Sequence, residues 1–294
     1  MHTTNGASHL AQHDPLLGCR VLVVSNRGPV QFHQRSDGRS LPSMASGGLA
    51  TALVAAATHA ELTWIAVAGN EADRKAFADR DHRTIRINDV TLTARYVPVS
   101  DKVYRLHYDD TSNRTLWFLQ HYLLQSEISP SFGAADRRAW NEGYVPVNRA
   151  VADAVIDELS NLDDEERERT IVLLQDYHLY LAPGMIRAAL PTVKMGHFTH
   201  IPWPSARNWQ FLPQQFTQAI IQSMIQNDIV GLQTPLDVEN FALCAKHFLP
   251  GASCTSEGSN LVICWKGSTV RVHAYPISID PEYVRKVASG PVAQ

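Results

Sequence analysis

Residues 171–204 read IVLLQDYHLYLAPGMIRAALPTVKMGHFTHIPWP and contain a complete strand–helix–strand unit. The continuous apolar run at 171–174 predicts a parallel strand that is buried on both faces. Apolar residues near helical spacing predict a helix over about 180–190, and a shorter run predicts a second strand at 194–199. Units of this kind build open parallel sheets, so the stretch predicts an α/β fold in which helices flank a Rossmann-like parallel sheet.

Polar side chains follow both predicted strands of this unit. Asp176 comes directly after the first strand, and His200 comes directly after the second. Ligands of open parallel sheets bind beyond the carboxyl ends of the strands, so we expect both side chains to face one cleft. Pro202 and Pro204 each fix a φ angle and should keep the turn after His200 rigid. The alternatives are that Asp176 caps the next helix and that His200 is a packed, hydrogen-bonded histidine.

Size and charge restrict the class of protein. The chain has 294 residues, of which 45% are hydrophobic and 19% charged, and its net charge is −3. This composition is typical of a globular protein, and the scattered lysines and arginines argue against a nucleic-acid or membrane partner. No apolar run is long enough to span a bilayer, and residues 1–17 lack an apolar signal core. We therefore expect a cytoplasmic protein whose residues 1–17 form a mobile tail.

The cysteines and histidines do not suggest a metal site. Cys19, Cys244, Cys254 and Cys264 form no CxxC pair, and the 13 histidines are dispersed along the chain. We expect the four cysteines to be reduced structural thiols and expect no bound metal.

The first predicted strand, 20–24, is followed by a long connection. The next helix is predicted to begin only at Ser46, with Gly47 and Gly48 in its first turn. So long a connection usually forms a lid or binding loop, and two glycines at a helix start allow backbone amides to approach a diphosphate. Arg27, in the same connection, is suited to bind a phosphate. The alternatives are a tight turn before a packed helix and a solvated surface arginine.

The segment 108–121 predicts a helix with an amphipathic start and an aromatic end. Tyr108 and Trp117 could line a sugar site by ring stacking and hydroxyl contacts, or they could simply belong to the core.

The rest of the chain predicts further elements of the same fold. Strands are expected at 62–67, 84–87, 91–97 and 228–233, with a hairpin formed by 261–265 and 269–273. Helices are expected at 71–79, 136–160, 213–226 and 235–248, and a charged surface connection at 163–169.

Together, these segments resemble the trehalose-6-phosphate synthase family of retaining glycosyltransferases over about residues 20–285. The segments that carry the resemblance are SNRGP at 25–29, SGGLATAL at 46–53, the block from Tyr108 through SN to LW at 117, QDYHL at 175–179, HIPWPS at 200–205, DIVGLQT at 228–234 and YPISID at 275–280. The resemblance implies the N-terminal, acceptor-side half of a GT-B architecture, with one Rossmann-like domain at 18–285 and a linker stub at 286–294.

The resemblance also implies roles for single residues. The implied donor-binding residues are Gly47 and Gly48 at the diphosphate and His200 at the donor sugar. The implied acceptor-binding residues are Arg27, Tyr108, Trp117 and Asp176. Asp176 and His200 are the implied catalytic residues.

The implied activity is transfer of glucose, with retention, from a nucleotide sugar such as UDP-glucose to a sugar phosphate such as glucose 6-phosphate. The implied scheme uses no cofactor, no metal and no protein nucleophile, so catalysis would rest on positioning and on stabilising charge at the leaving phosphate.

Two departures leave alternatives open. Phe118 stands where the family often has a proline, and Thr199 stands where an apolar residue is more common. Glycerol 3-phosphate or a cyclitol phosphate is therefore an alternative acceptor. We also expect the donor-binding domain to be absent from this chain. A separate donor domain or chain could then complete the enzyme, or the chain could be a non-catalytic sugar-phosphate-binding or regulatory domain that partners a synthase.

Overall fold

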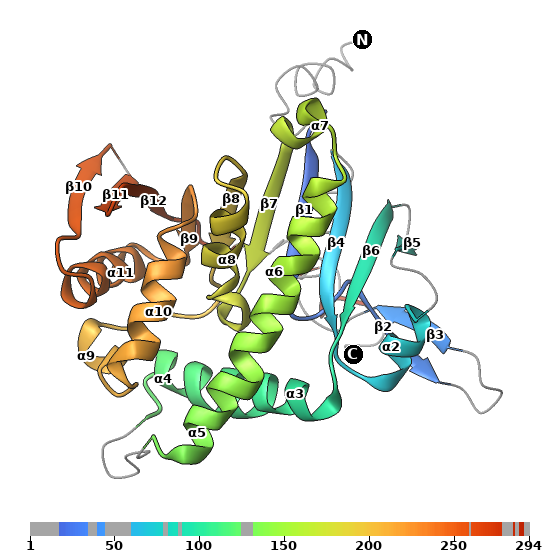
Figure 1. The fold of residues 1–294 in the computed structure, drawn as a ribbon, viewed down its shortest axis with the longest axis horizontal. Coiled ribbons are helices and arrows are strands. Elements are labelled where there is room, and N and C mark those ends of the chain that lie inside the picture. Colours follow the sequence, from blue (N-terminus) through green and yellow to red (C-terminus); the bar gives the residue numbers. More distant parts are fainter. Residues whose placement is uncertain are drawn as a thin grey trace.

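A ten-stranded sheet organises the molecule (Figure 1). The computed structural model describes residues 18–34, 40–44, 60–78, 82–87, 90–124, 132–258, 260–277, 285 and 288–290. The strand order is β10-β11-β12-β9-β8-β7-β1-β4-β6-β5. The strands are β1 (Arg20–Ser25), β4 (Glu61–Ala68), β5 (Arg83–Ile87), β6 (Val90–Pro98), β7 (Thr170–Gln175), β8 (Lys194–Phe198), β9 (Ile229–Leu232), β10 (Ser253–Glu257), β11 (Asn260–Trp265) and β12 (Ser268–Ala274).

The centre of the sheet is parallel and its two edges are antiparallel. Every neighbouring pair from β12 through β9, β8, β7, β1 and β4 to β6 is parallel. The edge strands β5, β10 and β11 pair antiparallel to their neighbours. A separate hairpin consists of β2 (Val30–Gln34) and β3 (Ser40–Met44). The predicted parallel α/β sheet is confirmed, and its central strands are the apolar runs of the sequence.

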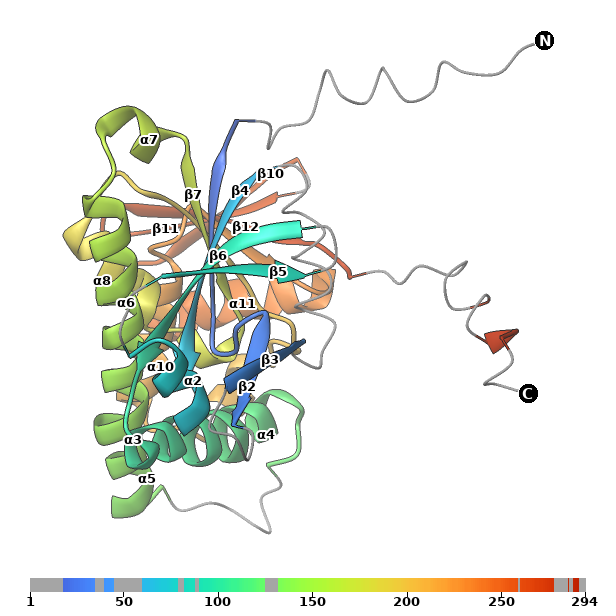
Figure 2. The ribbon, with the colours of Figure 1, turned by 90° about the vertical axis from the view of Figure 1, so that its right-hand side faces the viewer.

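Helices cover the sheet unequally. The described helices are α2 (Glu71–Ala76), α3 (Asp101–Arg105), the π-helix η1 (Leu106–Trp117), α4 (Phe118–Gln120), α5 (Ala134–Ala139), the short π-helix η3 (Trp140–Tyr144), α6 (Val145–Ser160), α7 (Asp164–Glu168), the 3-10 helix η4 (Tyr177–Leu179), α8 (Ala182–Ala189), α9 (Ala206–Trp209), α10 (Gln214–Met224) and α11 (Pro235–Phe248). Figure 2 shows α6, α8 and α10 along one face of the sheet, and α2 with the β2–β3 hairpin on the other.

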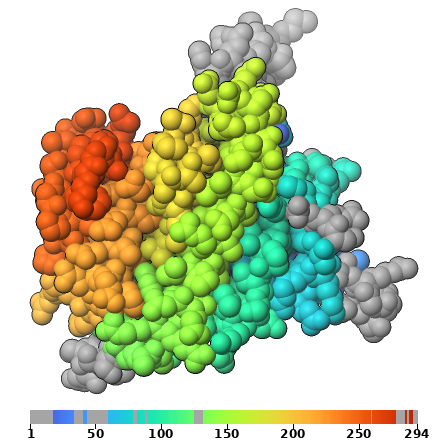
Figure 3. Space-filling view, in the orientation of Figure 1, coloured from blue at the N-terminus to red at the C-terminus, as the bar shows by residue number. Residues whose placement is uncertain are grey.

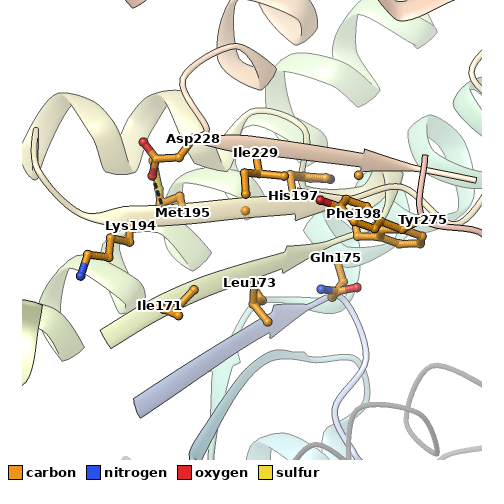
Figure 4. Close-up of a pocket in the computed structure, with 12 residues that line it drawn as sticks. Ile171, Leu173, Gln175, Lys194, Met195, His197, Phe198, Asp228, Ile229 and Tyr275 are labelled. Carbon is orange, nitrogen blue, oxygen red and sulfur yellow. Dashed lines mark hydrogen bonds between the residues drawn. The ribbon is translucent and has the colours of Figure 1, made fainter. Parts of the chain in front are cut away.

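The long helix α6 forms the centre of the helical face in the space-filling view (Figure 3). Its buried Val151 and Val155 pack with Val172 and Leu174 of β7, which point to this face. The opposite face is apolar as well. There, β7, β8 and β9 line a groove of about 430 Å³ that contains Leu173 and the half-exposed Ile229 (Figure 4).

The direction of chain travel reverses at the middle of the sheet. From β7 the chain moves through β8 to β9, with α8 and α10 on the helical face. From β1 it moves the opposite way through β4 to β6, and α2 lies on the other face. Right-handed crossovers require this change of face when the direction changes. The neighbours β1 and β7 therefore form the switch point, where α/β sheets commonly bind ligands.

Most of the predicted elements agree with the structure, and the differences are local. The connection after β1 contains the β2–β3 hairpin, and the charged segment 163–169 contains α7. The polar strand β10 was not predicted, because its sequence SCTSE has no apolar periodicity. The helix predicted at 108–121 begins earlier, at Asp101, and is mostly π-helical. The expected tail 1–17 and the helix predicted from Ser46 lie outside the described residues.

Candidate functional site

The candidate site lies at the carboxyl ends of β1 and β7. The first residues beyond β1 are Asn26 and Arg27, and the first beyond β7 is Asp176. Because β1 and β7 pair in parallel, their carboxyl ends lie side by side at the same end of the sheet. The sequence-predicted residues Arg27 and Asp176 therefore share one edge.

Asp176 is held by three hydrogen bonds to the end of β8. Its N–H donates to the Phe198 carbonyl at 2.7 Å, and its carbonyl accepts from His197 Nε2 at 3.1 Å. Its carboxylate Oδ1 accepts from the backbone N–H of His200 at 3.2 Å. The residue has a φ of 70°, which is uncommon for a residue other than glycine. Asp176 precedes the 3-10 helix η4, but the predicted helix, α8, has Leu181 at its N-cap, so the alternative that Asp176 caps that helix is wrong.

Burial makes the ionised form of the Asp176 carboxyl group less favourable. Burial raises the pKa of the carboxyl to about 6, although the N–H groups of His200 and Tyr177 lower it. The side chain is 18% exposed, so it is still accessible to a ligand. Above about pH 6 the site presents a carboxylate that can accept hydrogen bonds from hydroxyl groups.

His200 lies beside Asp176, as the sequence predicted, and its ring is neutral. Burial lowers the pKa of the imidazole to about 4. Ring atom Nε2 lies 3.0 Å from Oε1 of Gln175, the last residue of β7. The Phe198 ring packs edge-on against the imidazole, with centroids 4.7 Å apart. His200 is thus packed and hydrogen-bonded, as the alternative expected, and its partial burial also leaves it exposed in part at the edge where Asp176 lies.

Arg27 and Tyr108 form a pair at the same edge. Arg27 Nη2 donates to the Tyr108 hydroxyl at 2.5 Å, and the guanidinium carbon lies 5.2 Å from the centre of the Tyr108 ring. Arg27 itself is exposed. The described partner of this guanidinium is thus an aromatic hydroxyl, which leaves its positive charge for an anion.

Aromatic stacking connects Tyr108 to Asp176. The Tyr108 ring stacks on Tyr104 at 5.4 Å and on His178 at 5.6 Å, with interplanar angles of 9° and 10°. His178 Nδ1 in turn lies 4.0 Å from Asp176 Oδ2. Burial lowers the pKa of His178 well below its usual range, and His107 and Arg27 lower it further. His178 is therefore a neutral spacer between the arginine pair and the carboxylate.

The buried side chain of Asn26 holds the stacked rings in place by hydrogen bonds. The Asn26 side chain bonds to the Tyr104 hydroxyl at 3.3 Å and to His107 Nε2 at 3.1 Å. Burial lowers the pKa of His107 to about 3, so this ring is neutral too. Asn26 thereby fixes the position of η1 relative to the end of β1.

The π-helix η1 decides which side chains share a face. Nine positions separate Tyr108 from Trp117, which is about two and a half turns of α-helix and would place them on opposite sides. A π-helix has i→i+5 hydrogen bonds and roughly 4.4 residues per turn, so the same nine positions make about two turns. Tyr108, Asn113 and Trp117 consequently lie along one stripe of η1.

The stripe reaches the end of β7 through Asn113. Its Oδ1 accepts a hydrogen bond from the Tyr177 hydroxyl at 2.9 Å. Trp117 stacks on His121 at 4.0 Å and is half-buried, and its described ring contacts are with this histidine and Phe118. The structure thus pairs Arg27 with Tyr108 and Asp176 with His200, joins the two pairs through His178, and connects Trp117 to them through η1. Gly47 and Gly48 lie outside the described residues.

A cavity of about 200 Å³ lies beside the Arg27–Tyr108 pair. The residues that line it include Arg27, Tyr104, Tyr108 and Asp73. Burial raises the pKa of Asp73, and its carboxylate accepts from the Phe32 N–H at 2.8 Å.

Several supporting residues were not singled out from the sequence. Gln175 and His178 flank Asp176, and Asn26 precedes Arg27, so adjacency to a predicted site residue was the available signal. Tyr104 and His107 gave no such signal, because their role depends on how η1 packs on the end of β1.

Within the described residues, no cluster of three or more His, Cys, Asp or Glu side chains is arranged to hold a metal ion. None of the described helices is both long and apolar enough to cross a membrane. Cys19, Cys244, Cys254 and Cys264 form no disulfide bonds.

Comparison with known proteins identifies sequences and structures that are similar to this chain. The UDP-forming alpha,alpha-trehalose-phosphate synthase 2 of Aspergillus niger is 29% identical over 295 residues, covering 99% of this chain and 55% of that protein. A solved E. coli trehalose-6-phosphate structure bound with UDP-2-fluoro glucose superposes with a TM-score of 0.69 at 26% identity, covering 92% of this chain and 52% of that one. A Burkholderia xenovorans UDP-forming synthase in complex with glucose-6-phosphate gives 0.68 at 22% identity, covering 93% and 54%, and shows the fold alone.

The chain spans about half the length of the relatives it matches. The expected fold, the N-terminal half of a GT-B architecture, is confirmed by these superpositions. The family model for glycosyltransferase family 20 matches residues 19–294, nearly the whole chain. The resemblance seen in the sequence is therefore confirmed, and the chain belongs to glycosyltransferase family 20.

Proposed function

We propose that this chain is the acceptor-side half of a retaining hexosyltransferase of the trehalose-6-phosphate synthase type, which transfers glucose from UDP-glucose to glucose 6-phosphate. One observation carries the proposal. The Arg27–Tyr108 pair and the Asp176–His200 pair lie at one sheet edge and are connected through His178. A cationic group and a carboxylate that share one sheet edge suit a ligand with a phosphate at one end and hydroxyls at the other.

The acceptor phosphate binds at Arg27 and Tyr108. The exposed guanidinium has donors free for a phosphate, and the tyrosine hydroxyl can donate to the same group once its ring is held by Tyr104 and His178. Hydrogen bonds to a charged group contribute about 1.5–3 kcal/mol each, so Arg27 is expected to distinguish a sugar phosphate from the free sugar.

The acceptor sugar lies between Asp176 and the η1 stripe. The Asp176 carboxylate accepts hydrogen bonds from sugar hydroxyls, and Trp117 lies on the same helix stripe as Tyr108 and offers a ring surface to the sugar. The three hydrogen bonds to the end of β8 keep the carboxylate in place before the ligand binds.

The donor sugar contacts His200, and Gly47 and Gly48 approach its diphosphate. The other donor contacts come from a second Rossmann-like domain, supplied by a longer chain or a separate one. In the reaction, an acceptor hydroxyl oxygen bonds to the anomeric carbon of glucose while the bond from that carbon to the diphosphate oxygen breaks. The hydroxyl proton passes to the leaving diphosphate, and both events take place on the same face of the sugar. This chain contributes positioning and hydrogen bonds to that step.

Calorimetric titration of the chain with glucose 6-phosphate, with glucose and with UDP tests the acceptor site. We expect glucose 6-phosphate to bind more tightly than glucose. Arg27→Ala should weaken glucose 6-phosphate binding about 10- to 100-fold and leave glucose binding nearly unchanged. Arg169→Ala is the matched control, because this exposed arginine precedes β7 at the opposite edge of the sheet. Equal losses for both ligands would remove Arg27 from the phosphate role.

Titration with glycerol 3-phosphate and a cyclitol phosphate tests the alternative acceptors, and tighter binding of either would replace glucose 6-phosphate in the proposal. Adding a donor domain and assaying glucose transfer tests the enzyme role. Glucose 6-phosphate binding without any transfer in that mixture would instead support a sugar-phosphate-binding or regulatory domain.

A further inference from the structure

The amide of Gln175 sets the chemistry of the His200 ring. Gln175 is the last residue of β7, is 5% exposed and lines the apolar groove (Figure 4). Its Oε1 lies 3.0 Å from His200 Nε2. An amide oxygen can only accept, so the contact is a hydrogen bond only if Nε2 carries the proton.

A neutral imidazole has one proton to place. Once Nε2 holds it, Nδ1 has a free lone pair and becomes a hydrogen-bond acceptor. The edge-on packing of Phe198 restricts rotation of the ring, and the hydrogen bond from the backbone N–H of His200 to Asp176 fixes the backbone that carries it. Tautomer and orientation are therefore determined together by residues at the ends of β7 and β8.

We propose that Gln175 is a positioning residue that holds His200 in the Nε2-protonated tautomer, so that Nδ1 accepts a hydrogen bond from a hydroxyl of the donor sugar. The second half of this proposal rests on the proposed function, and the first half does not. The neutral state that the tautomer requires agrees with the burial of the ring, which lowers the pKa of His200 to about 4. Among the described residues, the Asp176 carboxylate accepts from the backbone N–H of His200, and burial lowers the pKa of the neighbouring His197 to about 3.

Nitrogen-15 NMR of the histidine-labelled chain at pH 7 tests the tautomer without any substrate. The His200 signals are assigned by their loss in His200→Gln. We expect one protonated nitrogen, Nε2, with a proton that exchanges slowly with water. Gln175→Leu, which has a similar volume and no acceptor, should let that proton exchange fast and shift both ring nitrogens toward the mixture found in free histidine. Leu173→Met, in the same strand and groove, is the control and should leave the signals unchanged.

Two results would overturn the first half of the proposal. One is a proton on Nδ1 in the unaltered chain, and the other is an unchanged Nε2–H signal in Gln175→Leu. Because the unaltered chain is itself informative, a variant that failed to fold would still leave the first result decisive.

Kinetics of the enzyme completed with its donor domain test the second half. Gln175→Leu should lower kcat/KM for UDP-glucose about tenfold and leave the KM for glucose 6-phosphate within about twofold, a split that general loss of structure would not produce. Gln175→Glu keeps the acceptor but raises the pKa of His200, so its kcat/KM should fall at pH 6 and recover toward pH 8. A normal kcat/KM in Gln175→Leu, combined with a changed tautomer, would overturn the sugar contact while leaving the tautomer assignment in place.

Discussion

The carboxyl group of Asp176 is held where its charge opposes folding. Its pKa is raised to about 6 by burial, whereas an unfolded chain has a pKa near 3.8. Between about pH 4 and 6 the folded chain therefore binds more protons than the unfolded chain, and the free energy of unfolding falls as the pH rises through this range. Above pH 6 the full cost is present. A buried charge that costs stability and faces a ligand is typical of functional sites.

Asp176→Asn should therefore stabilise the chain while removing its function. Asparagine tolerates a positive φ and can still accept from the His200 N–H, so we expect the free energy of unfolding to rise by about 1–3 kcal/mol at pH 8 and to change little at pH 4. Glucose 6-phosphate binding should weaken at pH 8. Urea unfolding at both pH values measures the first effect, and calorimetry the second. Asp153→Asn, on the exposed side of α6, is the control. A loss of stability at pH 8 would contradict this account of the carboxylate.

Gly28 keeps Arg27 in place because no side chain fits there. A Cβ at position 28 would lie 1.9 Å from the Tyr96 hydroxyl, which donates to the Val30 carbonyl. The Tyr96 ring also stacks on Phe77 at 4.4 Å, so it has little room to move.

We expect Gly28→Ala to cost about 1–3 kcal/mol of stability and to weaken glucose 6-phosphate binding by displacing the neighbouring arginine. Gly196→Ala is a matched control, since its Cβ would meet Leu173 at an ordinary 3.4 Å. Urea unfolding and calorimetry measure the two effects, and equal tolerance of both substitutions would show that Tyr96 moves freely.

At the scale of elements, the π-helical geometry of η1 determines which of its side chains face the candidate site. Two threonine hydroxyls bond to carbonyls five residues earlier, Thr111 to Leu106 at 2.9 Å and Thr115 to Asp110 at 3.0 Å. These bonds match the i→i+5 pattern of the π-helix and help to maintain it. The wider turn aligns Tyr108 with Trp117, so the helix type and the acceptor site depend on the same contacts.

Thr111→Val keeps the side-chain shape and removes one of these bonds. Thr111 is buried, so we expect a loss of about 1 kcal/mol of stability together with a several-fold weaker affinity for glucose 6-phosphate. The exposed Thr91 on β6 offers the control, Thr91→Val. Urea unfolding gives the stability and calorimetry the affinity. An unchanged affinity, with the stability lost as expected, would separate the π-helix geometry from acceptor binding.

The sequence predicted the parallel strands well and the π-helix not at all. The runs at 171–174 and 20–24 are apolar on both faces, a pattern that few other structures produce. In η1 the periodicity fits a poor α-helix, and π-helices are too rare to be expected from spacing. The placement of Asp176 beside His200 followed from strand ends alone. The positive φ of Asp176 and the Gln175 contact depend on tertiary hydrogen bonds, which leave no pattern in the sequence.

At the scale of the whole molecule, the two faces of the sheet differ in what covers them. Val230 of β9 points into the helical face and is fully buried, whereas its neighbour Ile229 points into the groove and is 41% exposed. One strand thus samples both environments at adjacent positions, because side chains alternate between the faces of a sheet.

This contrast predicts that substitution by threonine lowers the free energy of unfolding by different amounts at positions 230 and 229. Val230→Thr places a hydroxyl in a packed core and should cost about 2 kcal/mol or more, whereas Ile229→Thr should cost less than about 1 kcal/mol because this side chain is 41% exposed. Urea unfolding of this chain measures both, and each serves as the control for the other. Similar costs would mean that a further part of the protein covers the groove in solution, since the free energy of unfolding reports burial by any segment of the folded chain. A large difference would agree with the 41% exposure of Ile229 in the groove.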